Sequence, residues 1–288
     1  MIKRKIFFTV LASLLALFSM SYSQNRQVPP LKIDRISDSL YQILGGQGAN
    51  GGFYIGDNGV LVIDAKMTEE SVAATITEIK VKTDKPILYL VNTHSDGDHI
   101  AGNQFFPESV TIIAHEKCRQ EFFHPRSNGQ PSVWTDNPAL ALYVPSLTFS
   151  NTMTLHLGDK RVELWYFGVG HTKGDIVVYF PEEKTAFLGD QIFIGRPQLI
   201  HSYKGGNSFG HVKALSRMLE TLEAEQFCSG HADPVDRKTI EHHIQEMVTL
   251  QNSVKASIEL GKSLEEIQKE FPENHARLLE SIFNEIKN

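Results

Sequence analysis

The sequence predicts an α/β protein in which two mixed sheets pack face to face, with helices on their outer faces. Two observations predict this arrangement. Between residues 32 and 92, short strand-like runs separated by turn residues lead into an amphipathic helix and a final apolar strand. Between residues 110 and 260 the same order recurs, with strands first and helices later. Two β-rich halves that each close with helices are typical of two sheets covered by helices.

In the first half, four short runs separated by turn residues predict an antiparallel meander. The next segment, from Thr68 to Lys82, predicts a helix, because Thr68 is a suitable N-cap and the apolar residues recur on one face. ILYLVN at 87–92 is a nearly continuous apolar run, as expected for a strand covered on both faces. The four runs are IDRI at 33–36, YQIL at 41–44, GFYIG at 52–56 and VLVIDA at 60–65.

The second half predicts a series of strands and two longer helices, at about 208–222 and 236–260. Ser263 and Glu266 form a capping-box pattern that opens a last pair of short helices. We therefore expect a single domain over residues 24–288, with a helical C-terminal extension from about residue 262. The expected strands are 110–114, 153–157, 162–167, 176–180, 185–188 and 226–229.

The N-terminal residues 1–23 have the three parts of a secretory signal peptide. Basic residues at 3–5 precede an uncharged, mostly apolar run at 6–20. The segment 21–23 then supplies the small residues that precede a cleavage site after Ser23. A membrane anchor is the alternative, but this run is shorter than the roughly 20 apolar residues that span a bilayer. We expect cleavage after Ser23, export to a periplasm or the medium, and no membrane anchor in the mature chain.

Composition and charge limit the classes of partner. The chain has 28 Lys and Arg against 34 Asp and Glu, a formal net charge of −6, and removal of the signal peptide would make it more acidic. A surface of this sign repels phosphate backbones, so we expect a small-molecule substrate and no nucleic acid. Cys118 and Cys228 are far apart in the sequence, and we expect buried free thiols, although export would permit a disulfide.

The segment NTHSDGDH at 92–99 carries four potential metal ligands directly after the apolar run. Three more candidates each follow a strand-like run and a glycine, where a sharp turn presents a side chain at the rim of a sheet. Any one of them would ordinarily be a turn or capping residue, but together they indicate a two-metal site. Clustered imidazoles suit Zn²⁺, and added carboxylates extend the choice to Mn or Fe. The seven candidates are His94, Asp96, Asp98, His99, His171, Asp190 and His231.

These residues resemble the HxHxDH motif of the metallo-β-lactamase superfamily and the His, Asp and His that follow it in that family. The resemblance extends from the glycine-rich segment 45–52 through VLVID at 60–64 to GHAD at 230–233. It implies a four-layer αβ/βα sandwich (the metallo-β-lactamase fold) with two metal ions at one edge, Zn²⁺ first among the candidates. By this pattern the first metal would be held by His94, Asp96 and His171, the second by Asp98, His99 and His231, with Asp190 bridging both.

One position departs from the family pattern, because Asp96 stands where the motif has its middle histidine. A shorter, anionic oxygen ligand would there replace an imidazole at the first metal. We expect two occupied sites, with Mn or Fe tolerated beside Asp96. A weakened and partly empty first site, or a displaced metal, are the alternatives.

The resemblance implies a hydrolase in which a hydroxide shared by two metals attacks the substrate. Asp98 would orient that hydroxide as well as bind metal. In this family an Asp at position 190 is typical of hydrolases of thioesters, lactones and esters, whereas many true β-lactamases carry Cys or Ser there. We therefore expect an exported hydrolase of an ester, lactone, thioester or amide, a role compatible with weak β-lactamase activity.

Three alternatives stay open: a dedicated metallo-β-lactamase, a hydrolase of a small phosphodiester, which HxDxDH also resembles, and a binding protein whose first site is inactive. Two further residues are candidates for substrate contact. Lys204 would meet a substrate carboxylate, unless it is only a solvated lysine. Trp134 lies in the turn-rich segment 125–138, which is either a surface connection or a lid over the substrate.

Overall fold

The computed structural model describes residues 29–125 and 129–288. The signal peptide expected at residues 1–23 lies outside this part of the chain. Within the described residues the strands form one sheet of seven and one of six. The first sheet holds β1 (Lys32–Arg35), β2 (Leu40–Leu44), β3 (Gly51–Ile55), β4 (Val60–Ile63), β5 (Ile87–Val91), β6 (Thr111–His115) and β7 (Leu147–Phe149); the second holds β8 (Thr152–Leu157), β9 (Lys160–Trp165), β10 (Val177–Phe180), β11 (Thr185–Phe187), β12 (Gln226–Cys228) and β13 (Val235–Asp236).

Both sheets are mixed, as the sequence predicts. Strands β1 to β4 form the expected antiparallel meander, and β4 to β7 pair in parallel. In the second sheet β8 to β11 are antiparallel, β12 pairs in parallel with β11, and β13 closes the edge in antiparallel. Strands β5, β11 and β12 each lead directly into a segment that carries candidate ligands.

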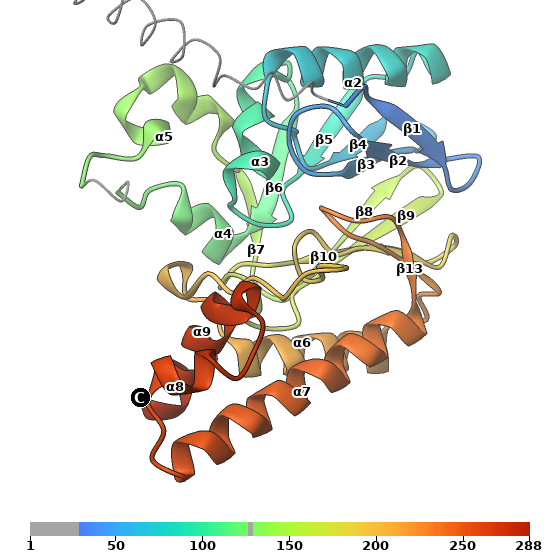
Figure 1. The fold of residues 1–288 in the computed structure, drawn as a ribbon. Helices are drawn as coiled ribbons and strands as arrows, with labels where there is room; N and C mark the ends of the chain where they lie inside the picture. The colour runs from blue at the N-terminus through green and yellow to red at the C-terminus, as the bar shows by residue number, and fades with distance from the viewer. Residues whose placement is uncertain (1–28, 126–128) are drawn as a thin grey trace, which may run out of the picture.

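Helices cover the two outer faces, which gives the molecule four layers (Figure 1). The helices of the described residues are α2 (Glu69–Lys82), α3 (Gly97–Ile100), η1 (Ala101–Phe105), α4 (Glu116–Glu121), α5 (Val133–Asp136), η2 (Pro138–Tyr143), η3 (Ser202–Lys204), α6 (Ser208–Thr221), α7 (Arg237–Glu259), α8 (Leu264–Gln268), η4 (Glu273–His275) and α9 (Ala276–Lys287). Helix α2 lies on the first sheet, whereas α6 and α7 lie on the second (Figure 1). Thr68 caps α2 as predicted, and Val72 and Ile79 lie on the buried face of this helix.

The main core lies between the two sheets, where apolar side chains from both inner faces meet. Tyr54 of β3 and Phe180 of β10 are fully buried there, with ring centroids 4.9 Å apart. Burial of a large apolar side chain contributes about 1.5–3 kcal/mol, so this layer holds the sheets together. Separate apolar clusters lie under α2 and under α6 and α7. Cys118 and Cys228 are buried and free, as expected.

The structure adds small elements to the sequence prediction. Strands β7 and β13 have three and two residues, and runs this short have no readable periodicity. The expected pair of C-terminal helices is present, and Ser263 forms the predicted capping box with Glu266 at the start of α8. An apolar cluster joins Met247 of α7 to Ile282 of α9. Among the described residues, we find no helix with the length and apolar character that crossing a membrane requires.

Candidate metal centre

Four loops bring the candidate ligands to one edge of the two sheets. The first follows β5 and includes α3, the second lies between β9 and β10, and the others follow β11 and β12. Glycines shape two of these turns. Gly189 has a φ of +54°, a left-handed conformation that favours glycine. At Gly230 a Cβ atom would collide with Asp190 and His99, so glycine allows this loop to approach the other ligands.

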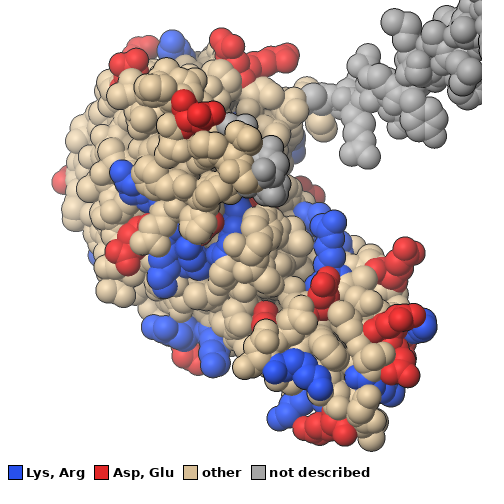
Figure 2. Space-filling view, turned by 90° about the vertical axis from the view of Figure 1, so that its left-hand side faces the viewer, with Lys and Arg blue, Asp and Glu red and all other residues tan. Residues whose placement is uncertain are grey.

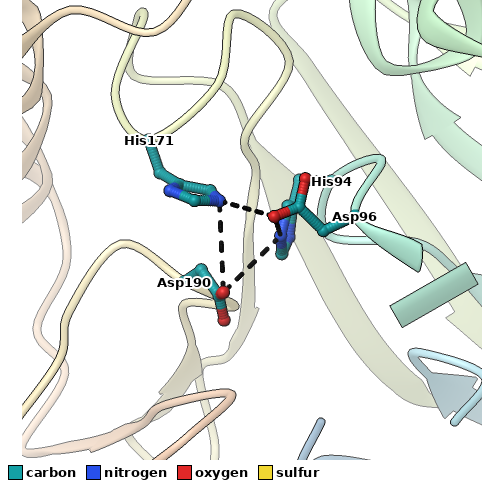
Figure 3. A group of neighbouring side chains, drawn as sticks. All are labelled: His94, Asp96, His171 and Asp190. Atoms are coloured by element: carbon teal, nitrogen blue, oxygen red, sulfur yellow. Dashed lines mark hydrogen bonds and ion pairs between the residues drawn. The ribbon is translucent and has the colours of Figure 1, made fainter. Parts of the chain in front are cut away.

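The first group consists of His94, Asp96, His171 and Asp190, whose ligand atoms all lie within 4.8 Å of one another. Asp96 Oδ2 lies 3.0 Å from His171 Nε2 and 3.6 Å from His94 Nε2. Asp190 Oδ2 lies 4.0 Å from His171 Nε2 and 3.9 Å from His94 Nε2. Figure 3 shows these side chains turned toward one another. All four are buried.

The second group consists of Asp98, His99 and His231. Asp98 Oδ2 lies 3.2 Å from His231 Nε2. Asp190 also faces this group, because its Oδ1 lies 3.1 Å from His99 Nε2 and its Oδ2 lies 3.2 Å from His231 Nε2. The structure thus brings all seven predicted ligands together, with Asp190 between the two groups, where a bridging ligand would lie.

Hydrogen bonds on the far side of two imidazole rings fix the nitrogen that faces the centre. His171 Nδ1–H donates to the Leu199 carbonyl oxygen at 2.8 Å. His99 Nδ1–H donates to Asp64 Oδ2 at 2.7 Å. With Nδ1 engaged in this way, the lone pair of Nε2 points into the centre, which is the usual arrangement of metal-binding histidines.

Two residues near the ligands were not assigned from the sequence. The Asp64 carboxylate, besides accepting from His99, accepts hydrogen bonds from the backbone N–H and the hydroxyl of Thr93, both at 2.8 Å. Its position at the end of VLVID is the signal that could have found it. His201 Nδ1 lies 3.3 Å from Asp96 Oδ2. No comparable signal marks His201, because it lies in a long irregular segment.

The carboxylates and imidazoles of the centre shift one another's pKa. Burial alone would raise the pKa of the Asp190 carboxyl, but His99 and His231 hold it well below its usual range. Burial alone would lower the pKa of His231, but hydrogen bonds to Asp190 and Asp98 raise it to about 9. The centre is therefore an anionic pocket that draws positive charge onto its histidines.

A divalent cation fits this charge and these donors. Among the described residues, His94 Nε2 is buried without a hydrogen-bond partner, which ordinarily costs about 1–3 kcal/mol. The buried atoms His99 Nε2 and Asp190 Oδ1 face each other at 3.1 Å. A metal ion would bind these atoms and displace the protons that the carboxylates draw onto the imidazoles. Imidazole nitrogens combined with carboxylate oxygens suit Zn²⁺ and related divalent metals.

The two residues predicted to contact substrate, Lys204 and Trp134, both have partners within the protein. Lys204 Nζ lies 2.7 Å from Asp96 Oδ1, so its ammonium is already paired with a candidate ligand. Trp134 is buried, and its ring centroid lies 5.1 Å from that of Phe122 in a small apolar cluster. The segment around Trp134 folds inward because burial of a large indole is strongly favourable.

A groove of about 740 Å³ lies beside the centre, between the segment 193–198 and helix α7. Phe193 belongs to both places: it lines the groove, and its ring stacks on His231 with centroids 5.5 Å apart. Ile194, which also lines the groove, is exposed. The second group of ligands therefore lies next to this groove, with the buried ring of Phe193 between them.

Comparison with known sequences identifies the family. A profile of the metallo-β-lactamase superfamily matches residues 44–231, a range that includes every candidate ligand. The type 2 metallo-β-lactamase of Elizabethkingia meningoseptica is 24% identical over 244 residues, covering 81% of this chain and 91% of that protein. The 2,4-dinitroanisole O-demethylase subunit alpha of Nocardioides sp. (strain JS1661) is 26% identical over 142 residues, covering 49% of this chain and 40% of that protein.

Solved structures share the fold. A metallo-β-lactamase from Pontibacter korlensis superposes with a TM-score of 0.63 at 19% identity, covering 76% of this chain and 99% of that one. The DIM-1 metallo-β-lactamase gives the same TM-score and identity, covering 77% of this chain and 99% of that one. From the profile match and the four-layer fold, the chain belongs to the metallo-β-lactamase superfamily and is a metal-dependent hydrolase.

Proposed function

We propose that this protein is an exported hydrolase that uses two divalent metal ions, with Zn²⁺ the first candidate, to cleave an ester, lactone, thioester or amide. The position of Asp190 carries the proposal. Its Oδ1 lies 3.1 Å from His99 Nε2 and its Oδ2 lies 3.2 Å from His231 Nε2 and 3.9 Å from His94 Nε2. A carboxylate that faces both ligand groups can bridge two metals, an arrangement common in hydrolytic sites.

In this proposal the metal ions and the residues of the centre have separate roles. When bound, the metal ions would supply Lewis acidity, which polarises the substrate carbonyl and lowers the pKa of water. We assign the orientation of the attacking water to Asp98, because its side chain is 32% exposed whereas that of Asp190 is 4% exposed. The exposed side chain of Ile194, next in the chain to Phe193, would offer an apolar surface to an acyl substrate in the groove beside the centre.

Two other substrates compete with this proposal. The names of the relatives support a β-lactam, and the HxDxDH variant supports a small phosphodiester. Figure 2 shows Lys and Arg side chains interspersed with Asp and Glu on the lower part of the molecule, where the C-terminal helices lie.

A substrate panel tests the proposed reaction. The zinc-loaded protein would be assayed with a lactone, an aryl ester, a thioester, the β-lactam nitrocefin and bis-p-nitrophenyl phosphate. We expect turnover of at least one ester, lactone or thioester, with loss on chelation and recovery when zinc is added. Turnover of nitrocefin alone would favour a dedicated β-lactamase, and turnover of the phosphodiester alone would contradict the proposal.

Export is tested separately. Expression of the full chain in a bacterium with a periplasm should yield a processed protein outside the cytoplasm, whose intact mass corresponds to a chain beginning at Gln24. Replacing the basic residues at 3–5 with Asp should keep the unprocessed chain in the cell, because a signal peptide requires a positive first segment. Processing of neither protein would contradict export.

A further inference from the structure

Asp96 presents its two carboxylate oxygens to different partners. Oδ2 faces the metal centre, 3.0 Å from His171 Nε2 and 3.6 Å from His94 Nε2, and it also lies 3.3 Å from His201 Nδ1. Oδ1 points away from these imidazoles (Figure 3) and accepts a hydrogen bond from Lys204 Nζ at 2.7 Å. The ammonium therefore contacts the carboxylate from its outer side and leaves the space between the imidazoles open to a cation.

Lys204 is held in this place by further contacts. Its Nζ also donates to the Ser95 carbonyl oxygen at 2.9 Å and to Ser95 Oγ at 3.2 Å, so each of its three protons has an acceptor. The backbone is fixed as well. The N–H of His201 donates to the His171 carbonyl oxygen at 2.8 Å, and the N–H of Lys173 donates to the Lys204 carbonyl oxygen at 3.1 Å. The loop that carries Lys204 is thus bonded to the loop that carries His171.

The charges of positions 96 and 204 balance. A histidine at position 96 would be a neutral ligand, whereas Asp96 adds a negative charge to a centre that already contains Asp98 and Asp190. The ammonium of Lys204 lies within 2.7 Å and cancels that charge. An Asp–Lys pair therefore presents one oxygen ligand with no net charge, which matches the charge of an imidazole.

We infer that Lys204 is a positioning residue that makes Asp96 a one-oxygen ligand of the first metal, by fixing the rotation of the carboxylate and cancelling its charge. This inference rests on the metal-ligand role of Asp96 in the proposed function. It assigns Lys204 to the metal centre and leaves it no part in binding a substrate carboxylate.

The inference predicts that positions 96 and 204 depend on each other. Lys204→Met removes the ammonium and frees the carboxylate to rotate, so zinc affinity at the first site should fall about 10–100-fold, as for loss of other partners of metal ligands. Asp96→His alone places an imidazole beside an unpaired ammonium, so it should also weaken binding. In the double variant the ammonium is absent, and affinity should return to within about tenfold of the original.

The experiment is a double-mutant cycle on the full chain. Chelator competition gives the zinc affinity of each site, elemental analysis counts the bound ions, and the absorption spectrum of the Co²⁺ form reports the geometry of the first site. Lys204→Arg keeps the positive charge and should retain most of the affinity. Lys262→Met is the matched control, because it breaks an ammonium–carboxylate pair of 2.5 Å with Glu270, outside the metal centre. Circular dichroism identifies any variant that fails to fold.

A non-additive cycle, with recovery in the double variant, supports the inference. Unchanged affinity in Lys204→Met, or equal loss from Asp96→His with and without Lys204, would overturn it, while a parent protein that binds two zinc ions and hydrolyses its substrate would keep the proposed function. A parent protein that binds no zinc would overturn both. If Lys204→Met does not fold, Lys204→Gln, which keeps a donor near Ser95 without the charge, decides the same question.

Discussion

Among the described residues, two clusters of buried histidines have opposite properties because of their surroundings. At the metal centre, burial alone would lower the pKa of His99 and His171, but neighbouring carboxylates raise both. Between α6 and α7, His211 and His243 face each other with 3.1 Å between their Nε2 atoms. Burial lowers the pKa of both, that of His243 to about 4. Burial therefore keeps an imidazole neutral, and carboxylates make its surroundings suitable for a cation.

This difference separates a functional cluster from a structural one. In our proposal, the carboxylates of Asp96, Asp98 and Asp190 make the first cluster a place where a metal ion would replace shared protons. The His211–His243 pair lacks such a partner in its contacts and instead joins two helices of the outer layer by one hydrogen bond. The comparison predicts that substitutions in the first cluster change metal content, whereas substitutions in the second change stability alone.

The largest expected effect is that of Asp190→Asn. The amide has a similar shape but no negative charge, and its position between the two groups means that both metals lose a ligand. We expect zinc affinity at both sites to fall by more than the roughly 10–100-fold that follows loss of an outer partner, and hydrolysis to fall to background. Equilibrium dialysis followed by elemental analysis measures this. Two tightly bound zinc ions in the variant would contradict the bridging role.

A pair of reciprocal variants separates the two groups. His231→Ala removes a ligand that faces only Asp98 and Asp190, and His94→Ala removes one that faces Asp96 and Asp190. Each variant should bind about one zinc ion instead of two, and each should lose hydrolysis, because both metals act on one substrate. The spectra of the Co²⁺ forms should differ between the two variants. Identical spectra would mean that the two groups do not form separate sites.

A smaller effect is expected from Asp64→Asn. Asp64 touches no metal in our assignment, but its Oδ2 accepts a hydrogen bond from His99 Nδ1–H at 2.7 Å and orients that ring. Zinc affinity at the second site should fall about 10–100-fold. The first site should lose less, because Asp64 reaches His94 only through the Thr93 hydroxyl, which lies 3.1 Å from His94 Nδ1. Glu285→Gln is the matched control, since this carboxylate accepts hydrogen bonds from the backbone N–H of Ser208, which is not a candidate ligand. An equal loss in both variants would indicate a general loss of stability.

The sequence was sufficient to predict which candidate ligands lie together, because each follows a recognisable strand-like run. His171, Asp190 and His231 come directly after a glycine that ends such a run, and parallel or neighbouring strands bring these ends to one edge. The same logic extends to Asp64 at the end of β4. Local pattern was therefore enough where a side chain is positioned by the end of a strand.

Pattern failed where a side chain is positioned by an irregular loop. Lys204 and His201 lie in a segment without periodicity, so nothing in the sequence showed that the ammonium pairs with Asp96, more than 100 residues earlier in the chain. Trp134 illustrates the same limit in reverse. The neighbouring residues in the sequence are polar and rich in turn formers. Trp134 nevertheless lies on the short helix α5, where its indole packs against Phe122 and is buried.

The smallest predicted effect tests the structural cluster through pH. Burial lowers the pKa of His243 to about 4. Between about pH 6.5 and 4, its imidazole is therefore neutral in the folded chain but binds a proton in the unfolded chain. This histidine therefore lowers the free energy of unfolding as pH falls from about 6.5 toward 4, by up to about 1.4 kcal/mol per pH unit. His243→Leu removes that loss, but it also leaves His211 Nε2 without its partner.

At pH 8 the variant should thus be about 1–3 kcal/mol less stable than the parent, and the gap should narrow below pH 6.5. Urea unfolding of both metal-free proteins at several pH values measures this gap. The titration of the metal ligands contributes equally to both proteins and therefore cancels from the difference. Zinc content should be unchanged in His243→Leu. A gap that stays constant from pH 8 to 5 would show that His243 does not titrate as its burial requires, whereas a loss of zinc would erase the distinction between the two histidine clusters.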